Sequence, residues 1–273
     1  MSKVRILFIL LSLFLPTGTA LSPDQDESQH ILKNVSQTYK TLTSYCFEAN
    51  SIVEIKTERT QMKMERPILL AAIKPDKIRM EVKSQLMDLL VVSNGPVTWE
   101  YMPQLNQYIK RTGGPTTIVS KGVDGIESTS DKEEYLHLMA VALGVLLPRY
   151  DDILEGLKRS NLLREESLEI NGASMSCYVI EAEYDKPESF PGAKESPKTF
   201  WIDRERFVVL RERYIVKIPS GEFGAGEQTH TLEFKAVKVN EALPETLFSF
   251  TPPEGAKEGE ELSSPSGKKK KQP

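Results

Sequence analysis

The feature that most restricts the fold of this chain is an alternation of apolar and polar residues in short runs. Over residues 45–55, apolar side chains such as Tyr45, Phe47 and Val53 stand at odd positions and alternate with polar ones such as Glu48 and Glu54. Residues 77–82 show the same alternation. A period of two residues is that of a β-strand with one buried face, which is typical of antiparallel sheets. The sequence therefore predicts an antiparallel sheet with one apolar face.

Turn signals separate these runs. Pro75-Asp76, Asn94-Gly95 and Asn171-Gly172 each stand between two of them, and Asn-Gly is the strongest short signal for a hairpin. This pattern predicts about ten strands. The expected strands are residues 45–55, 66–73, 77–82, 89–93, 98–102, 168–170, 174–184, 199–203, 208–217, 229–239 and 247–251.

Helices are expected in three places. Residues 24–42 carry apolar side chains at helical spacing, and residues 135–147 follow a capping box of Ser130 and Glu133. Residues 151–159 predict a shorter and more polar helix. Because no strand–helix–strand rhythm runs through the chain, we expect an α+β protein with a single large antiparallel sheet. It would form one domain, residues 21–253.

The two ends of the chain differ from this domain. Residues 1–20 begin with Lys3 and Arg5, continue with an apolar run and close with small residues up to Ala20. This order is typical of a secretory signal peptide, and the run is about half of the ~20 residues that a membrane anchor would need. We expect export to the periplasm with cleavage near Ala20. Residues 254–273, rich in Lys, Glu, Gly and Ser, are expected to be a disordered tail.

Motifs for catalysis or metal binding are not found in the sequence. The net charge of −4 over 273 residues lacks the basic excess of a nucleic-acid-binding protein. His30, His137 and His230 have no second ligand at metal-binding spacing, and no Cys-x-x-Cys occurs. The glycines of residues 221–226 lie between two strands, not at the strand-to-helix turn of a phosphate-binding loop. We therefore expect a protein that is not an enzyme, with no catalytic residues, metal site or cofactor.

The two cysteines, Cys46 and Cys177, allow two interpretations. In an oxidising compartment an even number of cysteines can pair. Both lie on the polar side of their expected strands, which permits a disulfide if those strands are neighbours. Two separate, half-buried thiols are the alternative, and the sequence leaves both open.

Several short motifs, in their order along the chain, resemble the LolA-like lipoprotein-carrier superfamily of the periplasm. Each motif alone is short, and the order of all of them carries the resemblance. They are AIKPDKIRME (72–81), VSNG (92–95), WEYMP (99–103), NQY (106–108), CYVI (177–180), FWID (200–203), VLR (209–211) and LFSFTPPEGA (247–256).

The resemblance implies an unclosed, half-open β-barrel made of one curved antiparallel sheet, with helices covering its concave face. That face would receive acyl chains of lipoproteins or lipids. The residues expected to line the hydrophobic cavity are Phe47, Val53, Ile55, Ile78, Met80, Trp99, Tyr101, Tyr178 and Ile180. The residues expected on the lid are Tyr135, Leu138, Met139, Leu143 and Leu146.

The resemblance also assigns a role to Lys74. In these carriers a basic residue just before the proline that precedes the third strand helps to hold the lid closed, and Lys74 has that position here. Because lysine presents a point charge in place of the arginine fork, a lid lock at Lys74 would be weaker or of a different design.

These observations favour a soluble, monomeric periplasmic carrier or binding protein for lipid-modified or other hydrophobic ligands. It would serve lipoprotein or lipid transport to the outer membrane, with an inner-membrane or outer-membrane protein as a further partner and no nucleic acid. One alternative is an envelope-stress sensor that resembles the RseB-type regulators and binds a partner protein. Another is an exported hydrolase, which would need a cluster of polar groups in the cavity.

Overall fold

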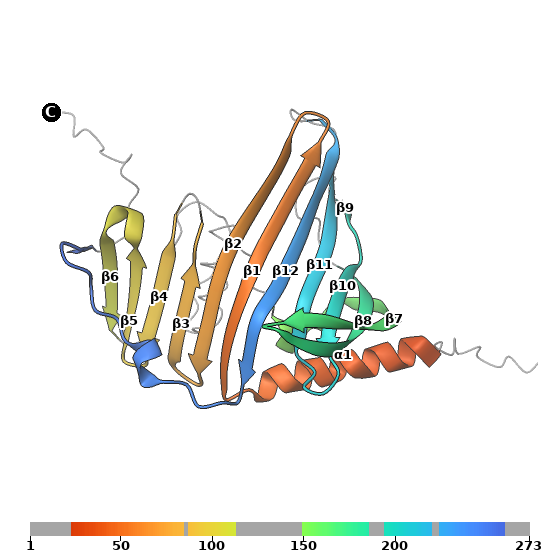
Figure 1. Cartoon of the computed structure of the whole chain (residues 1–273), viewed down its shortest axis with the longest axis horizontal. Helices are drawn as coiled ribbons and strands as arrows, with labels where there is room; N and C mark the ends of the chain where they lie inside the picture. The colour runs from red at the N-terminus through yellow and green to blue at the C-terminus, as the bar shows by residue number, and fades with distance from the viewer. Residues whose placement is uncertain (1–22, 85–86, 113–148, 186–193, 220–223, 260–273) are drawn as a thin grey trace, which may run out of the picture.

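The computed structural model describes residues 23–84, 87–112, 149–185, 194–219 and 224–259 (Figure 1). This part of the chain forms one 13-stranded sheet and one α-helix, α1 (Pro23–Thr41). The strands are β1 (Ser44–Thr57), β2 (Gln61–Ile73), β3 (Lys77–Val82), β4 (Leu89–Asn94), β5 (Val97–Met102), β6 (Gln107–Thr112), β7 (Leu157–Ile170), β8 (Ala173–Tyr184), β9 (Lys194–Glu195), β10 (Lys198–Asp203), β11 (Val209–Ile218), β12 (Gly226–Val239) and β13 (Lys257–Glu258). Three short 3-10 helices are η1 (Pro103–Leu105), η2 (Tyr150–Asp152) and η3 (Glu245–Phe248).

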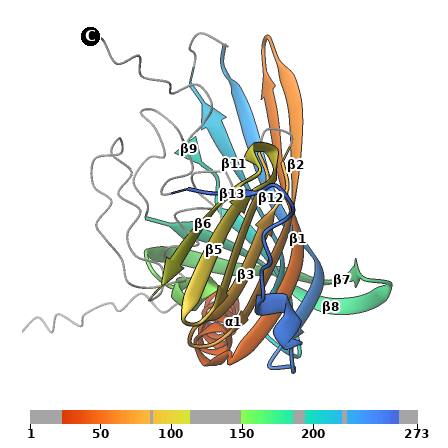
Figure 2. The same cartoon turned by 90° about the vertical axis from the view of Figure 1, so that its left-hand side faces the viewer.

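The sheet consists of two antiparallel series of strands that meet in its middle. Its order is β13–β6–β5–β4–β3–β2–β1–β12–β11–β10–β8–β7, with β9 beside β11. The seam between the series pairs β1 with β12, from Tyr45 opposite Val239 to Thr57 opposite Gly226. Among the described strands, those at the two ends of this order do not pair with each other, and the sheet is curved (Figure 2). The expected unclosed, curved antiparallel sheet is therefore confirmed.

Helix α1 lies on the inner side of this curve. Its apolar residues Ile31, Leu32 and Val35 recur at helical spacing and are buried. The helix packs against β7 and η2, at one end of the sheet. The buried residues around it form one large cluster that extends along the sheet as far as Val91 of β4. We call the side of the sheet that carries α1 the concave face, and the opposite side the convex face.

The last described residues, 244–259, form a C-terminal strap across the convex face of β3 to β6 (Figure 1, blue). The Lys77 ammonium lies 2.6 Å from a carboxylate oxygen of Glu245, and the Arg79 guanidinium donates to the carbonyl of Leu247 at 3.0 Å. Phe248 is 1% exposed. At the end of the strap, β13 pairs in parallel with β6.

Two elements of the prediction are wrong. Residues 151–159 do not form a helix, because the chain turns at Gly156, whose φ of +68° favours glycine, and enters β7 at Leu157. Residues 247–251 do not form a strand, because η3 and the chain after it cross β3 and β4 instead of lying beside a strand edge. The structure also adds β6, which the sequence pattern had not predicted. Strand β13 lies beyond Pro253, the expected end of the domain.

Candidate functional site

Three cross-strand rows of apolar side chains line the concave face from β1 to β4. In the middle row Phe47 faces Leu70, Leu70 faces Met80, and Met80 faces Val91. Directly opposed residues of an antiparallel pair share one face of the sheet, so the rows form a continuous apolar surface. The outer rows are Tyr45, Ala72 and Ile78 on one side, and Ala49, Ile68, Val82 and Leu89 on the other.

Most of the predicted cavity residues lie on this face. The strand register places Phe47, Val53, Ile55, Ile78, Met80, Tyr178 and Ile180 there. Ile55 and Tyr178 are half-buried and the others are buried. The structure therefore brings these side chains onto one surface, and their contact with a ligand stays a prediction.

The predicted position of Trp99 and Tyr101 is wrong. Trp99 pairs with Val92 and Tyr101 with Leu90, so both point away from the face that carries Val91. Their rings instead contact Phe250 of the C-terminal strap, with ring centroids 6.3 and 5.6 Å apart. An aromatic ring is buried equally well by the strap and by a cavity, so residue type alone did not reveal the face.

Polar residues take the concave positions of β5 that the aromatic residues were expected to fill. Thr98 and Glu100 are each 2% exposed. Arg111 of β6 lies opposite Thr98 in the register, and its Nε donates to Glu100 Oε1 at 2.8 Å. The Asn94-Gly95 turn could have predicted this arrangement. Across the turn Ser93 pairs with Thr98, so these two side chains share a face, and every second residue of β5 lies on that same face. We call Thr98, Glu100 and Arg111 the polar end of the concave face.

A second polar cluster lies on the concave face of β10 to β12. The buried Glu212 accepts hydrogen bonds from Lys198 Nζ at 2.5 Å and from the Tyr150 hydroxyl at 3.1 Å. Burial, together with the neighbouring charge of Glu212, raises the pKa of Tyr150 well above its usual value. Beside it the rings of Tyr214 and His230 stack with centroids 4.7 Å apart, and burial lowers the pKa of His230. Because Lys198 and Tyr150 occupy the two oxygens of Glu212, this cluster ties η2 to the sheet.

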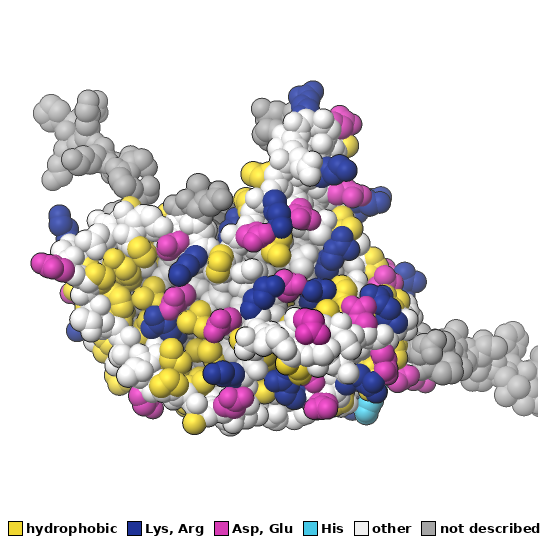
Figure 3. Space-filling model, viewed as in Figure 1, with side chains coloured by type: hydrophobic (Ala, Val, Ile, Leu, Met, Phe, Trp, Pro, Cys, Tyr) yellow, Lys and Arg dark blue, Asp and Glu magenta, His cyan; other side chains and the backbone are white. Residues whose placement is uncertain are grey.

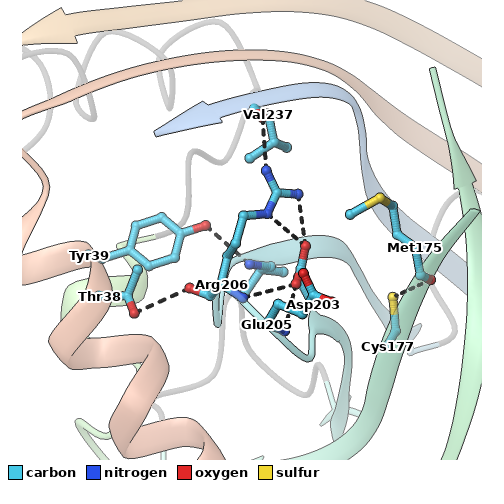
Figure 4. A network of polar contacts seen from close by, with 9 residues as sticks. Thr38, Tyr39, Met175, Cys177, Asp203, Glu205, Arg206 and Val237 are labelled. Carbon is cyan, nitrogen blue, oxygen red and sulfur yellow. Dashed lines mark hydrogen bonds and ion pairs between the residues drawn. The ribbon is translucent and has the colours of Figure 1, made fainter. Parts of the chain in front are cut away.

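A network around Asp203 holds α1 in place (Figure 4). Asp203 is buried in the turn between β10 and β11, where Oδ1 accepts from the backbone N–H groups of Glu205 and Arg206 at 2.8 and 3.0 Å. The Arg206 guanidinium donates to Asp203 Oδ2 at 2.8 Å and to the carbonyl of Val237 at 3.2 Å. Thr38 of α1 donates to the carbonyl of Arg206 at 3.4 Å. The turn thus joins β12 and the helix that covers part of the concave face.

Both cysteines are free thiols, so the disulfide that the sequence left open is not formed. Cys46 lies on β1 and Cys177 on β8, with β12, β11 and β10 between those strands. Adjacent strands are about 4.8 Å apart, whereas a disulfide needs Cα atoms within about 7 Å. Burial, followed by the negative charge of Asp203, raises the pKa of Cys177 to about 11, which keeps the thiol protonated at neutral pH.

Two other predicted features remain expectations. The lid, residues 135–147, lies outside the described residues. Lys74 lies at the turn between β2 and β3, where its side chain is exposed and its backbone N–H donates to the carbonyl of Thr43 at 2.8 Å. The role of Lys74 as a lid lock therefore stays a prediction.

Within the described ranges, no group of His, Cys, Asp and Glu side chains has an arrangement that would hold a metal ion. The helices of the same ranges are too short or too polar to cross a membrane.

The convex face carries charges of both signs (Figure 3). On its long strands Lys63 lies 2.7 Å from Glu65, and Arg211 lies 2.5 Å from Glu233. Apolar side chains gather near β4 to β6, where the strap packs (Figure 3). Interspersed charges are typical of a solvated surface and differ from the single-sign patch of a nucleic-acid-binding face.

Comparison with known proteins places the chain in a family. A family model described as "Predicted periplasmic protein (DUF2092)" matches residues 28–259. The chain belongs to the DUF2092 family. This DUF2092 protein has no match among curated proteins.

Solved structures show distant similarity to this DUF2092 protein. A LolA superfamily protein from Nitrosomonas europaea is 13% identical over 82% of this chain and 97% of its own, with a TM-score of 0.28. The lipoprotein LppX of Mycobacterium tuberculosis is 15% identical over 80% of this chain and 98% of its own, with a TM-score of 0.37. MucB in the structure of the Pseudomonas aeruginosa MucA/MucB complex is 12% identical over 82% of this chain and 61% of its own, with a TM-score of 0.39.

Proposed function

We propose that this DUF2092 protein is a soluble, monomeric periplasmic carrier or binding protein for lipid-modified or other hydrophobic ligands. Export with cleavage near Ala20 and a role in lipoprotein or lipid transport to the outer membrane are parts of this proposal. The family description as periplasmic supports the compartment.

The observation that carries the proposal is the continuous apolar surface on the concave face of an unclosed sheet. Within the described residues, α1 packs at the β7 end, whereas the apolar rows continue to β4 at the other half of the sheet. These rows are buried in the structure, so an acyl chain would have to take the place of the groups that now cover them. In that position it would keep apolar surface out of water, at about 25 cal/mol for each Å². The predicted lid, residues 135–147, would close over the chain and open to release it.

The first test is to purify the full chain from the periplasm under mild conditions and to analyse it by native mass spectrometry. We expect co-purifying lipid, and binding of a fluorescent fatty acid by the delipidated protein. A protein that is empty and does not bind the fatty acid would refute the proposal. Capture of a membrane-bound regulatory protein, without any lipid, would favour the sensor function instead.

Two neighbouring alanines provide a matched pair of variants for locating the ligand. Ala71 and Ala72 are both buried on β2, but Ala72 faces Tyr45 and Ile78 on the concave side and Ala71 points to the convex side. Each Ala→Leu change overfills its surroundings and is expected to cost about 1–3 kcal/mol of stability. Only Ala72→Leu should also weaken fatty-acid binding, by about fivefold or ~1 kcal/mol. Equal affinities of the two variants, measured by fluorescence titration, would place the ligand elsewhere.

A further inference from the structure

The polar end of the concave face contains a hydroxyl group without a partner. Thr98 Oγ1 is buried and has no hydrogen-bond partner, which holds for no other buried side-chain nitrogen or oxygen in the described ranges. A buried hydroxyl group that lacks a partner usually destabilises the fold, relative to the methyl group of a valine at the same place. Most buried polar groups in proteins are hydrogen-bonded, so an exception asks for a physical reason.

The position of Thr98 suggests that reason. It lies between Ser93 and Arg111 in the register, in the row that also contains Ile78. The hydroxyl group therefore lies at the end of an apolar row on the face where the proposed function places an acyl chain. A ligand atom that accepts a hydrogen bond would satisfy it.

The neighbouring charges decide whether that hydrogen-bond acceptor is charged or uncharged. The carboxylate of Glu100 is buried and paired with Arg111, whose side chain is 25% exposed. This pair is neutral as a unit, and separating two charges that are partly removed from water is costly. An anionic group would have to compete with Glu100 for the guanidinium, whereas an uncharged carbonyl would need only the hydroxyl group of Thr98.

We propose that Thr98 donates a hydrogen bond to the carbonyl oxygen of an ester- or amide-linked acyl chain. This inference rests on the proposed function and adds the orientation of the ligand. The carbonyl group lies at β5, beside Glu100 and Arg111, and the hydrocarbon chain runs from there along the apolar rows toward β1. The protein would then prefer acylated molecules to hydrocarbons or ethers of the same length.

The test compares two fluorescent probes of equal chain length, a pyrene-labelled monoacylglycerol ester and the corresponding alkylglycerol ether. We expect the wild-type protein to bind the ester more tightly than the ether. Thr98→Val should weaken ester binding about three- to tenfold, the range that one net hydrogen bond supplies, and leave ether binding unchanged. Thr98→Ser, which keeps the hydroxyl group, should retain the preference for the ester.

The stability of the ligand-free protein gives a second readout, which should not fall when ester binding weakens. Because Thr98→Val removes an unsatisfied buried hydroxyl group, the melting temperature should stay equal or rise even as ester binding weakens. Thr231→Val is the matched control, since Thr231 is half-buried on β12 and pairs with Ile52, on the other face of the sheet. It should not change the preference for the ester.

The outcomes separate the two proposals. If the protein binds both probes and Thr98→Val does not change the ratio of their affinities, the role of Thr98 is refuted and the carrier function stands. A fall in melting temperature for Thr98→Val would also refute it, because the hydroxyl group would then have a partner in the protein. If the wild-type protein binds neither probe, both the carrier function and the role of Thr98 are refuted.

Discussion

At the scale of single residues, the polar side chains inside the protein were the hardest to anticipate. The alternation of Ile78, Met80 and Val82 indicated a buried face on β3, and the structure confirms it. The expected place of Trp99 and Tyr101 on the concave face of β5 was wrong, because both rings lie on the face that the strap covers. Which face of a strand is inside depends on what covers the outer face, and the covering Phe250 lies far away in the sequence.

Tyr39 provides a prediction at this scale. Its hydroxyl group accepts a hydrogen bond from the backbone N–H of Val209 at 3.2 Å, and Val209 is fully buried. Tyr39→Phe removes this acceptor and is expected to lower the free energy of unfolding by about 1–3 kcal/mol, the cost of a buried group that loses its partner. Chemical denaturation measures the change.

The matched control is Tyr108→Phe, because the Tyr108 hydroxyl group donates to Glu258 at 3.0 Å in an exposed position. Water can replace that hydrogen bond, so the change should stay within about 0.5 kcal/mol. If both variants lose the same free energy of unfolding, the buried hydrogen bond between Tyr39 and Val209 stabilises the protein no more than an exposed one, and the prediction is wrong.

His230 predicts how stability depends on pH. Burial is the main cause that lowers its pKa. The nearby carboxylates of Glu195 and Glu212 raise this pKa, and the positive charges of Lys198 and Arg66 lower it. The unfolded chain then binds a proton at His230 more readily than the folded chain, so this residue stabilises the fold at pH values above its unfolded pKa of about 6.5. That contribution should be lost as the pH falls from about 6.5 through the lowered pKa.

His230→Gln isolates this effect. The free energy of unfolding of wild type and variant, measured from pH 8 to pH 5, should differ by an amount that changes in the acidic half of this range and is constant above pH 7. A difference between wild type and variant that is constant over the whole range would contradict the prediction.

At the scale of elements, the C-terminal strap shows why an amino-acid pattern can predict burial without predicting secondary structure. Segment 247–251 was expected to be a strand, and its apolar residues pack on the sheet without forming one. They do so through a short helix and an unpaired chain, with Phe248 against β3 and β4 and with Phe250 against the rings of β5. Burial requires apolar side chains, whereas a strand also requires a free edge with backbone groups to pair, and this segment crosses the sheet.

The strap can be tested independently of ligand binding. Phe248→Ala leaves a cavity on the convex face and is expected to cost about 3–5 kcal/mol. Ser249→Ala, at an exposed position beside it, should change stability by less than about 0.5 kcal/mol. Because the strap lies on the face opposite the apolar rows, fatty-acid affinity measured well below the melting temperature should be the same in both variants. A selective loss of affinity in Phe248→Ala would show that the two faces are coupled.

At the scale of the whole molecule, local patterns predicted the class of the fold better than its connectivity. Turn signals and alternation located most strands, including β3 with its observed bounds. They predicted neighbours only within hairpins, such as β4 with β5 across Asn94-Gly95 and β7 with β8 across Asn171-Gly172. The pairing of β1 with β12 joins segments that are far apart in the sequence, and no local motif describes it. The separation of Cys46 from Cys177 follows from the same order of strands, and for that reason the sequence could not decide whether they were bonded.

The seam between β1 and β12 has a consequence for the time course of folding. Strand β1 is made first, yet its partner β12 is the last of the long strands, so one whole edge of β1 has no partner until nearly the entire chain is available. Sheets dominated by contacts between distant parts of a chain fold slowly, and an exposed strand edge can pair with other molecules in the meantime. During its synthesis, this chain should therefore need protection by a chaperone until β12 is available.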